Sequence, residues 1–324
     1  MKRYQILGVT IIITLMMLGG LAFYISSPFP LSLATELTQA SSELGYVDFV
    51  NITVLIDNYP NGTLYSTWGV SMLVETNNFS ILMDAGPSSL LLEENAKALG
   101  KNLSLVDFVV ISHEHGDHTD GLPCVARINP NITVYVPAHM DNSTRTVIEN
   151  LGLNVVDISE TTILSSGIAI IGELHGPPYE QALGINIEGI GTAVVVGCSH
   201  PGVENIVEKA VNDLDVDPYL VIGGFHTYIA DQQTINNTVT KLLELGVEKI
   251  YPIHCCGDQI RSFIQENYLE HYGEGCVGTQ LFIGPRTPYT TPGFSYLSIF
   301  IITTVMTISA ILWSKKRKER ENQY

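Results

Sequence analysis

Cysteine is scarce in this chain, with five cysteines among 324 residues. Five unevenly spaced cysteines are too few to form a disulfide framework for a domain of this size. A single bond between Cys256 and Cys276, in an oxidising environment, is the pairing that the sequence leaves open. The fold must therefore depend on an apolar core, and the 45% apolar content is sufficient for one large globular domain.

Positive charge is scarce as well. The chain has 16 Lys and Arg residues against 33 Asp and Glu residues, which gives a formal net charge of −17. Seven of the basic residues lie in two tails, at positions 2–3 and 315–320, so the segment between the tails holds nine basic and 31 acidic residues. Nucleic-acid binding depends mostly on Lys and Arg at phosphates, so we expect no nucleic-acid partner and disfavour a nuclease.

Each end of the chain contains a long run without charge. Residues 5–25 carry no charged side chain, and neither do residues 294–313, which are followed by the basic cluster at 315–320. About 20 apolar residues are enough to span a bilayer, and basic flanks favour the cytoplasmic side. We therefore predict two transmembrane segments, with a cleaved signal peptide as the alternative for the N-terminal one.

These features predict a membrane-anchored organisation. Placing both basic ends in the cytoplasm puts the domain between them outside, so the predicted location is the cell membrane, with the lipid bilayer as a partner. Seven Asn-x-Ser/Thr sequons between positions 51 and 238 agree weakly with export. The predicted parts are a cytoplasmic end (1–4), a transmembrane helix or signal anchor (5–26), a tether (27–45), the globular domain (46–285), a tether (286–293), a transmembrane helix (294–313) and a basic cytoplasmic tail (314–324).

The most informative run lies at residues 112–118, with the sequence Ser-His-Glu-His-Gly-Asp-His. It follows an apolar stretch at 106–111 that is typical of a buried parallel strand, so it lies in the loop where open α/β sheets keep their sites. In a tight loop, with Gly116 giving the backbone freedom for the bend, His113 and His115 can converge on one cation, while Asp117 and His118 turn toward a second. Imidazole with carboxylate suits zinc, with iron or manganese as alternatives, and does not suit calcium.

Further histidines follow later predicted strands. His200 comes after the strand predicted at 192–196, and His254 after the strand at 249–252, so both should project at the same edge as the first run. His226 has the same context and is either another ligand or a substrate contact. Cys198 is either a ligand or a buried thiol that supports His200.

The spacing His-x-His-x-Asp-His resembles the signature of the metallo-β-lactamase superfamily, and the resemblance covers residues 48–285. The later motifs Gly-Cys-Ser-His (197–200), Gly-Gly-Phe-His (223–226) and His-Cys-Cys-Gly (254–257) are similar to one branch, the metal-dependent hydrolase-like dihydropterin-ribofuranosylaminobenzene phosphate synthases. Glu114, Gly116, Asp120 and Cys256 depart from the usual residues of that branch, which affects the substrate more than the metal.

The resemblance implies an α/β fold, the αββα four-layer sandwich of the superfamily, for residues 46–285. Hydrophobic periodicity and glycine punctuation predict its later elements. These are helices at 122–128, 145–151, 201–211 and 234–245, and strands at 132–136, 167–172, 192–196, 220–222 and 249–252.

The predicted cofactor is a pair of divalent metal ions, with zinc favoured. Asp84, in an Asp-x-Gly turn that the resemblance places beside the metal loop, is expected to orient ligands rather than to bind metal, and Asp57 has a similar expected role. The predicted metal ligands are His113, His115, Asp117, His118, His200 and His254.

The implied activity is hydrolysis by a metal-bound hydroxide, since a divalent ion lowers the pKa of bound water from 15.7 to about 7. Asp117 is the expected catalytic residue, because it would hold the second ion and accept a proton. The substrate is an unidentified small molecule with an ester, lactone, thioester or phosphoester bond. Two alternatives are a synthase of pterin cofactor biosynthesis and a surface receptor that binds metal or ligand without turnover; iron-based redox chemistry would need more carboxylates than are present.

Overall fold

The computed structural model describes residues 43–285. Both predicted transmembrane segments, the basic tail and all but residues 43–45 of the two tethers lie outside the described residues. Among residues 43–285, no helix has the length and the apolar character needed to cross a membrane.

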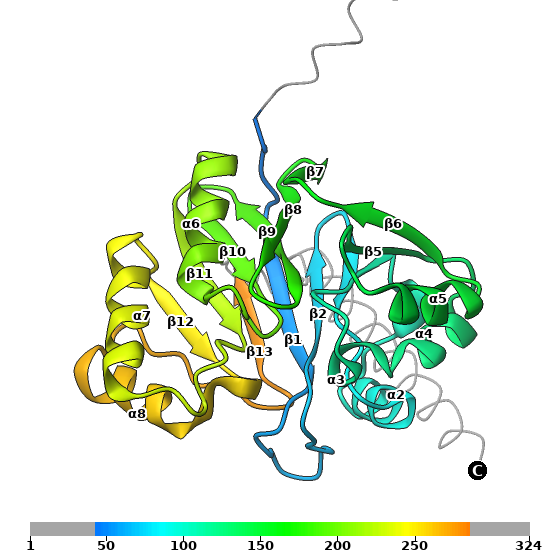
Figure 1. Cartoon of the computed structure of the whole chain (residues 1–324), viewed down its shortest axis with the longest axis horizontal. Coiled ribbons are helices and arrows are strands. Elements are labelled where there is room, and N and C mark those ends of the chain that lie inside the picture. The colour runs from blue at the N-terminus through cyan, green and yellow to red at the C-terminus, as the bar shows by residue number, and fades with distance from the viewer. Residues whose placement is uncertain (1–42, 286–324) are drawn as a thin grey trace, which may run out of the picture. The chain divides into compact units, whose positions relative to one another are not determined.

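Two β-sheets form the centre of the described domain (Figure 1). The first has seven strands in the order β13-β1-β2-β3-β4-β5-β6, and the second has six in the order β12-β11-β10-β9-β8-β7. The strands are β1 (Val50–Ile56), β2 (Ser71–Thr76), β3 (Ser80–Met83), β4 (Phe108–Val110), β5 (Thr133–Pro137), β6 (Asn154–Ile158), β7 (Thr162–Ser165), β8 (Ile168–His175), β9 (Tyr179–Ile187), β10 (Gly191–Val195), β11 (Pro218–Gly223), β12 (Lys249–Pro252) and β13 (Gln280–Ile283).

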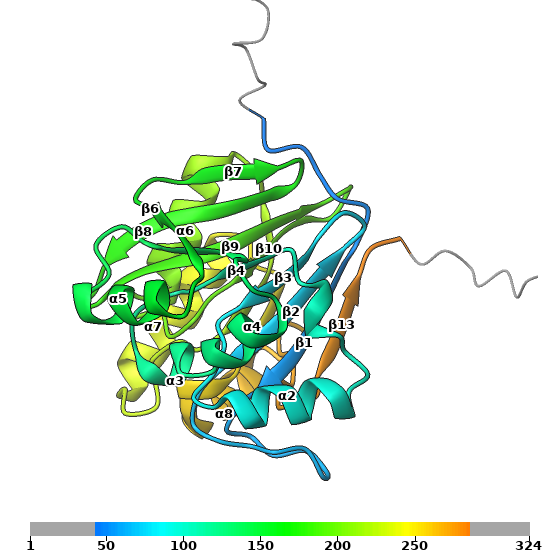
Figure 2. The same cartoon turned by 90° about the vertical axis from the view of Figure 1, so that its right-hand side faces the viewer.

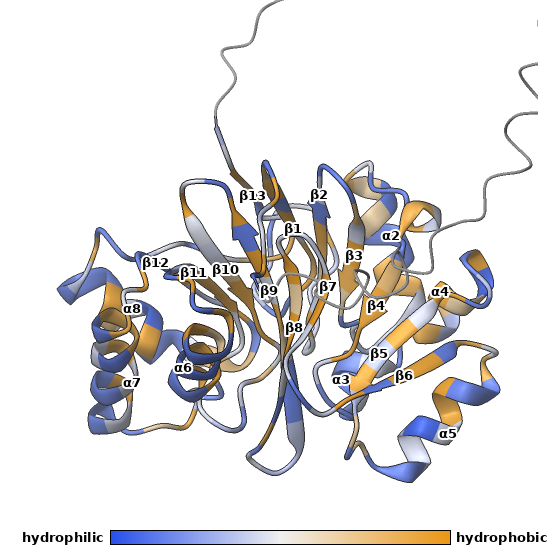
Figure 3. Cartoon of the chain, turned by 90° about the horizontal axis from the view of Figure 1, so that it is seen from above, coloured by the Kyte–Doolittle hydropathy of each residue, from blue (hydrophilic) through white to orange (hydrophobic). Residues whose placement is uncertain are grey.

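Helices cover the outer face of each sheet. Figure 2 shows α2, α4 and α5 in front of the first sheet, and Figure 3 shows α6, α7 and α8 on the far side of the second. The helices are α2 (Ser89–Ala98), α3 (Gly116–Thr119), α4 (Leu122–Ile128), α5 (Asn142–Asn150), α6 (Val203–Leu214), α7 (Gln232–Glu244) and α8 (Gly257–Asn267), with single turns η1 (Leu103–Leu105) and η2 (His254–Cys256).

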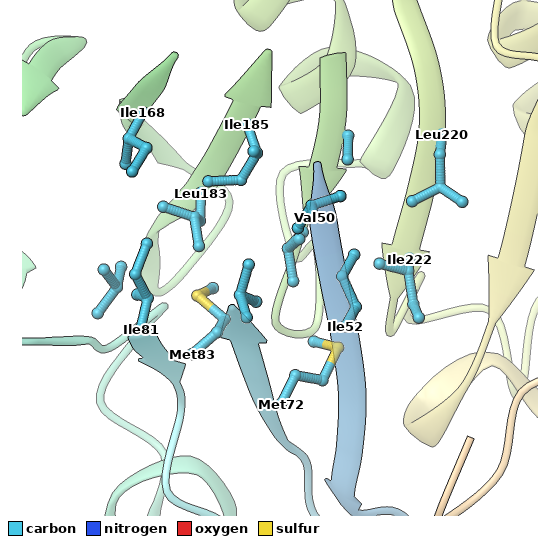
Figure 4. Packing of buried hydrophobic residues seen from close by; sticks show 14 of the residues in the cluster. Val50, Ile52, Met72, Ile81, Met83, Ile168, Leu183, Ile185, Leu220 and Ile222 are labelled. Carbon is cyan, nitrogen blue, oxygen red and sulfur yellow. The ribbon is translucent and has the colours of Figure 1, made fainter. Parts of the chain in front are cut away.

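The core has three layers because the central strands are buried on both faces. Successive side chains of a strand point to opposite faces. Ile81 and Met83 therefore pack between the sheets with Leu183 and Ile185 (Figure 4), whereas Leu82 faces the outer helices. Burial on both sides explains the continuous apolar runs of these strands. The predicted αββα arrangement is confirmed for the described residues.

Several element boundaries differ from the predictions. Helix α4 and strand β12 have the predicted bounds, whereas the strand expected at 106–111 is shortened to β4 and the helix expected from residue 201 begins at Val203. Gly202 has φ 97°, a left-handed value that a helix cannot include, so α6 starts after it. Strand β9 was not predicted, because Glu180, Gln181 and Gly184 interrupt its apolar pattern.

The arrangement of parallel strands brings the candidate ligands to one edge. β3, β4 and β5 run parallel in the first sheet, and β10, β11 and β12 run parallel in the second. The loops after β4, β10, β11 and β12 carry the motifs at 112–118, 197–200, 223–226 and 254–257. Carboxyl ends of parallel strands are the usual position of ligand sites in open α/β sheets.

Candidate metal centre

A buried carboxylate holds the loop at 112–118. Asp84 Oδ1 accepts the backbone N–H of Ser112 at 2.7 Å, and Oδ2 accepts the Ser112 hydroxyl and the Nδ1–H of His118, both at 2.7 Å. Asp84 is fully buried with φ 56°. The expectation that Gly116 supplies backbone freedom was wrong, because the φ of Gly116 is not left-handed. A side chain at this position would instead be crowded, since a Cβ would lie 2.8 Å from Asp120 Oδ2.

Three imidazoles form what we call the first cluster: His113, His115 and His200. Their ring centroids are separated by 4.6 Å (His113 to His115), 4.7 Å (His113 to His200) and 5.0 Å (His115 to His200). Nε2 of His113 lies 2.9 Å from Nδ1 of His115. Two ring nitrogens so close require a proton or a cation between them, because two lone pairs would repel each other.

A second cluster consists of Asp117, His118 and His254. Asp117 Oδ2 lies 3.7 Å from His118 Nε2 and 3.4 Å from His254 Nε2. Cys198 joins the two clusters, since its Sγ is 3.2 Å from His118 Nε2. One ligand atom from each of His118, Cys198 and His254 lies within 4.8 Å of the others, and the same holds for His113, Cys198 and His200. All predicted ligands thus meet in one place.

A second buried carboxylate, which the sequence analysis missed, holds the loop after β10. Glu180 accepts the backbone N–H groups of Cys198 and Ser199 at 2.7 Å each and that of His200 at 2.8 Å. Its Oε2 also accepts the Nδ1–H of His200 at 2.9 Å. The available signal was a charged residue inside an otherwise largely apolar stretch. In the structure Glu180 lies in strand β9 and is 1% exposed.

A third buried carboxylate holds His254. Asp57 Oδ1 accepts the backbone N–H of His254 at 2.8 Å, and Asn58 Oδ1 lies 3.2 Å from Nδ1 of the same residue. Burial raises the pKa of Asp57 to about 6. His254 has φ 51° and packs against the ring of Trp68 at 5.1 Å between centroids. Its Nε2 is buried and makes no hydrogen bond.

The hydrogen bonds of the imidazoles determine which nitrogen is free. Nδ1 of His113 lies 2.8 Å from the Ser112 hydroxyl, which itself donates to Asp84. Nδ1 contacts with protein oxygens also hold His118, His200 and His254. With Nδ1 held in this way, Nε2 is the nitrogen that each of these rings can offer to a cation in the shared centre. An imidazole held through its other nitrogen is the usual arrangement at protein metal sites.

The candidate ligands differ in the direction in which their surroundings shift their pKa values. Burial would lower the pKa of His118, but the charge and hydrogen bond of Asp84 outweigh it and raise the pKa to about 9. Burial lowers the pKa of His113 well below its usual value. Burial would raise the pKa of Asp117, yet close approach to His254 and the charge of His118 lower it. The centre therefore holds His113 neutral and Asp117 ionised, the forms that bind metals, whereas a cation that binds His118 has to displace a proton.

The remaining predicted residue lies at the border of the centre. His226 is exposed and its ring centroid is 4.5 Å from that of His200. It also approaches Cys198 and Cys255, and ligand atoms of these three residues lie within 4.8 Å of one another. The approach of Cys255 was not predicted.

The disulfide that the sequence left open is absent. Cys256 and Cys276 are both free thiols. Cys256 Sγ accepts the backbone N–H of Phe225 at 3.1 Å inside the core, whereas Cys276 Sγ lies 3.5 Å from the Thr279 hydroxyl. The two thiols thus contact different residues and do not contact each other.

The residues present fit a divalent cation. The centre offers imidazole nitrogens, one carboxylate and one thiol, which is a donor set of the kind that binds zinc and neighbouring transition metals. A cation between the ligands would give the buried Nε2 of His254 a partner. It would also separate the lone pairs of His113 Nε2 and His115 Nδ1.

Comparisons with known proteins find relatives by sequence and by fold. A synthase from Methanocaldococcus jannaschii, 7,8-dihydropterin-6-methyl-4-(β-D-ribofuranosyl)-aminobenzene-5'-phosphate synthase, is 28% identical over 279 residues, which cover 71% of this chain and 95% of the relative. The crystal structure of Tm1679, a metal-dependent hydrolase of the β-lactamase superfamily, matches with a TM-score of 0.64 at 23% identity, over 72% of this chain and 99% of that one. The metallo-β-lactamase fold protein YhfI from Bacillus subtilis matches with a TM-score of 0.56 at 14% identity, over 73% and 100%.

The family assignment follows from a match within the chain itself. The β-lactamase superfamily domain matches residues 80–255, which is more than half of the chain and includes the loop at 112–118, Cys198, His200 and His254. The resemblance predicted from the motifs, to the superfamily and to the synthase branch, is confirmed. The chain belongs to the β-lactamase superfamily.

Proposed function

We propose that the chain is a metal-dependent hydrolase that holds two divalent ions, with zinc favoured, one in each cluster. The observation that carries this proposal is the set of four histidines whose Nδ1 atoms contact protein oxygens and whose Nε2 atoms converge around Cys198. A structural role for the histidines would not require the buried Nε2 of His254 to lack a hydrogen bond.

The residues divide the work of such a site. Bound divalent ions would lower the pKa of water from 15.7 to about 7 and polarise the bond that is cleaved. Asp117, ionised and 22% exposed at its side chain, is the group that can accept a proton beside the substrate. Asp84 and Glu180 touch no solvent and act by orienting His118 and His200.

We propose a small ester, lactone, thioester or phosphoester as the substrate. The test uses the full chain, purified in detergent and loaded with zinc, against generic members of each class. Hydrolysis of one class that is lost on chelation and restored by zinc supports the proposal. Failure of every class, with metal bound and the fold intact, would favour a receptor that binds without turnover.

A second candidate is a synthase of pterin cofactor biosynthesis. It is supported by the relative from Methanocaldococcus jannaschii, which matches over 95% of its own length. The discriminating experiment supplies the purified chain with a dihydropterin that carries a leaving group on its 6-methyl carbon, together with ribofuranosylaminobenzene phosphate, and looks for the compound in that relative's name. Product formation would replace the hydrolase proposal, because the same centre would then serve a transfer between two substrates.

We also propose that the domain is anchored in the cell membrane and faces outward. The support is the pair of uncharged runs at 5–25 and 294–313 with the basic residues that flank them. Protease added to intact cells should then digest residues 46–285 and spare a tag placed after residue 324. Protection of the whole chain would contradict the outward orientation, and it would favour the pterin synthase, because an outward-facing domain would not meet a cytosolic pterin intermediate.

A further inference from the structure

Cys198, His226 and Cys255 come together from three loops, and we call them the thiol cluster. One ligand atom from each residue lies within 4.8 Å of the other two. Cys198 follows β10, His226 follows β11, and Cys255 lies in η2 after β12. Cys198 and Cys255 are 4% and 1% exposed, whereas His226 is exposed. The cluster is thus closed on the side of the thiols and open on the side of the imidazole.

Backbone hydrogen bonds fix the three loops independently of these side chains. The N–H of Gly224 donates to the carbonyl of Gly197 at 2.8 Å, and the Ser199 hydroxyl donates to the carbonyl of Gly224 at 2.7 Å. The N–H of Tyr228 donates to the carbonyl of Cys255 at 3.1 Å. The positions of the two thiols and the imidazole are therefore set before any ligand binds, which lowers the entropy cost of binding.

Two features of the backbone show that the close approach is specific. A Cβ at Gly224 would lie 2.6 Å from Cys255 Sγ and 2.7 Å from the Gly197 carbonyl oxygen, so only glycine lets the thiols approach. His226 has φ 52°, a left-handed conformation that is unfavourable for a histidine. Unfavourable backbone conformations persist where the surrounding structure enforces them, and they are concentrated at functional sites.

We propose that the thiol cluster is a further metal position, which takes one thiophilic cation such as zinc or copper(I). Two sulfur ligands and one imidazole form the Cys2His set known from catalytic zinc sites, with the fourth position left to solvent on the open side. Cys198 would be shared with the first and second clusters, because its Sγ also meets their ligand atoms. This position does not depend on hydrolysis, since it requires only the three side chains.

Cadmium is the probe, because its bonds to thiolates absorb in the ultraviolet. The full chain, purified in detergent, reduced and freed of metal by a chelator, is titrated with Cd²⁺. We expect the thiolate-to-cadmium absorption of two sulfurs per chain, and Cys255→Ser should lose about half of it at saturation. Cys124→Ser is the matched control, because this buried thiol lies in α4, in the core layer between the first sheet and its helices, and should leave the absorption unchanged.

His226→Ala provides a second test that does not disturb the core. The absorption should still reach the wild-type level, but the affinity for Cd²⁺ should fall about tenfold or more, because losing a ligand costs at least as much as losing a residue that supports one. Wild-type absorption in Cys255→Ser, or wild-type affinity in His226→Ala, would overturn the proposal. If the hydrolase screen succeeds but the titration shows only one cadmium-bound sulfur, the proposed function stands and the further metal position fails. If the titration shows two cadmium-bound sulfurs but no substrate is hydrolysed, the further metal position stands and the proposed function fails.

Discussion

The two halves of the centre are held in different ways. The loop at 112–118 carries four candidate ligands in succession, and Asp84 fixes it through one backbone N–H, one hydroxyl and one imidazole. The loop after β10 carries Cys198 and His200, and Glu180 fixes it through three backbone N–H groups and one imidazole. Each half therefore depends on a buried carboxylate from a neighbouring strand, but the first half also gathers four candidate ligands within one short sequence, whereas the second adds two.

Asp57 extends the comparison to the third loop. It accepts the backbone N–H of His254, at a separation of 197 positions in the sequence. Each of the three ligand loops thus has a buried carboxylate that accepts a backbone N–H group. Fixing the backbone as well as the ring holds the ligand atom more closely than a side-chain contact alone, which is what a metal site requires.

The largest effect is expected for the one carboxylate that belongs to the ligands themselves. Asp117→Asn keeps the shape of the side chain but removes its charge and its ability to accept a proton. Turnover should fall by at least ~100-fold with the fold intact, measured as kcat with the best substrate of the hydrolase screen. If Asp117→Asn were nearly fully active while Cys198→Ser were inactive, the nucleophile would have to be the cysteine, and both assignments would be wrong.

A smaller effect is expected for the carboxylate that holds the second half. Glu180→Gln removes the negative charge that faces four donors, and metal affinity should fall by roughly 10–100-fold, as measured by calorimetric titration. Glu188→Gln is the matched control, because Glu188 is an exposed residue just after β9. Equal affinities of Glu180→Gln and the wild type would mean that the loop after β10 needs no buried carboxylate.

The smallest effect is expected for the pH dependence of stability that the pair of His118 with Asp84 causes in the first half of the centre. Because the pKa of His118 is raised to about 9 from 6.5, its pair with Asp84 stabilises the metal-free fold fully below pH 6.5 and loses this effect as the pH rises through 9. The Tm of the chelated protein should therefore fall by several degrees over this window, since ~1 kcal/mol corresponds to roughly 2–4 °C for a domain of this size. Asp84→Asn should flatten the fall, and an equally steep fall in that variant would rule out the pair as its cause.

The same comparison explains what the sequence could predict. The four ligands at 113–118 are visible because they lie within six residues and follow an apolar strand, and the helix at 122–128 is predicted with its observed bounds. His200 and His254 were predicted from their positions after strands. They meet the first loop because two sheets pack against each other. The family resemblance predicted this packing, whereas hydrophobic periodicity could not.

Other features could not be predicted because they depend on contacts between distant strands. Glu180 is one acidic residue among many, and only the structure shows that it is buried beside the loop after β10 and accepts four hydrogen bonds. The approach of Cys255 to Cys198 depends on the absence of a side chain at Gly224. The pairing of Cys256 with Cys276, which the sequence left open, could not be decided for the same reason, because neighbours in space decide the partners of a thiol.

The most direct test of the account is the metal content of the full chain and of one variant. Elemental analysis of zinc-loaded wild type should find at least about two ions per chain, since each cluster offers three ligands and both share Cys198. His115→Ala should retain at least about one ion fewer, because it removes one imidazole of the first cluster. A chain that binds no metal, and whose fold and Tm are the same with and without chelator, would contradict the central claim that the histidines are arranged to hold metal.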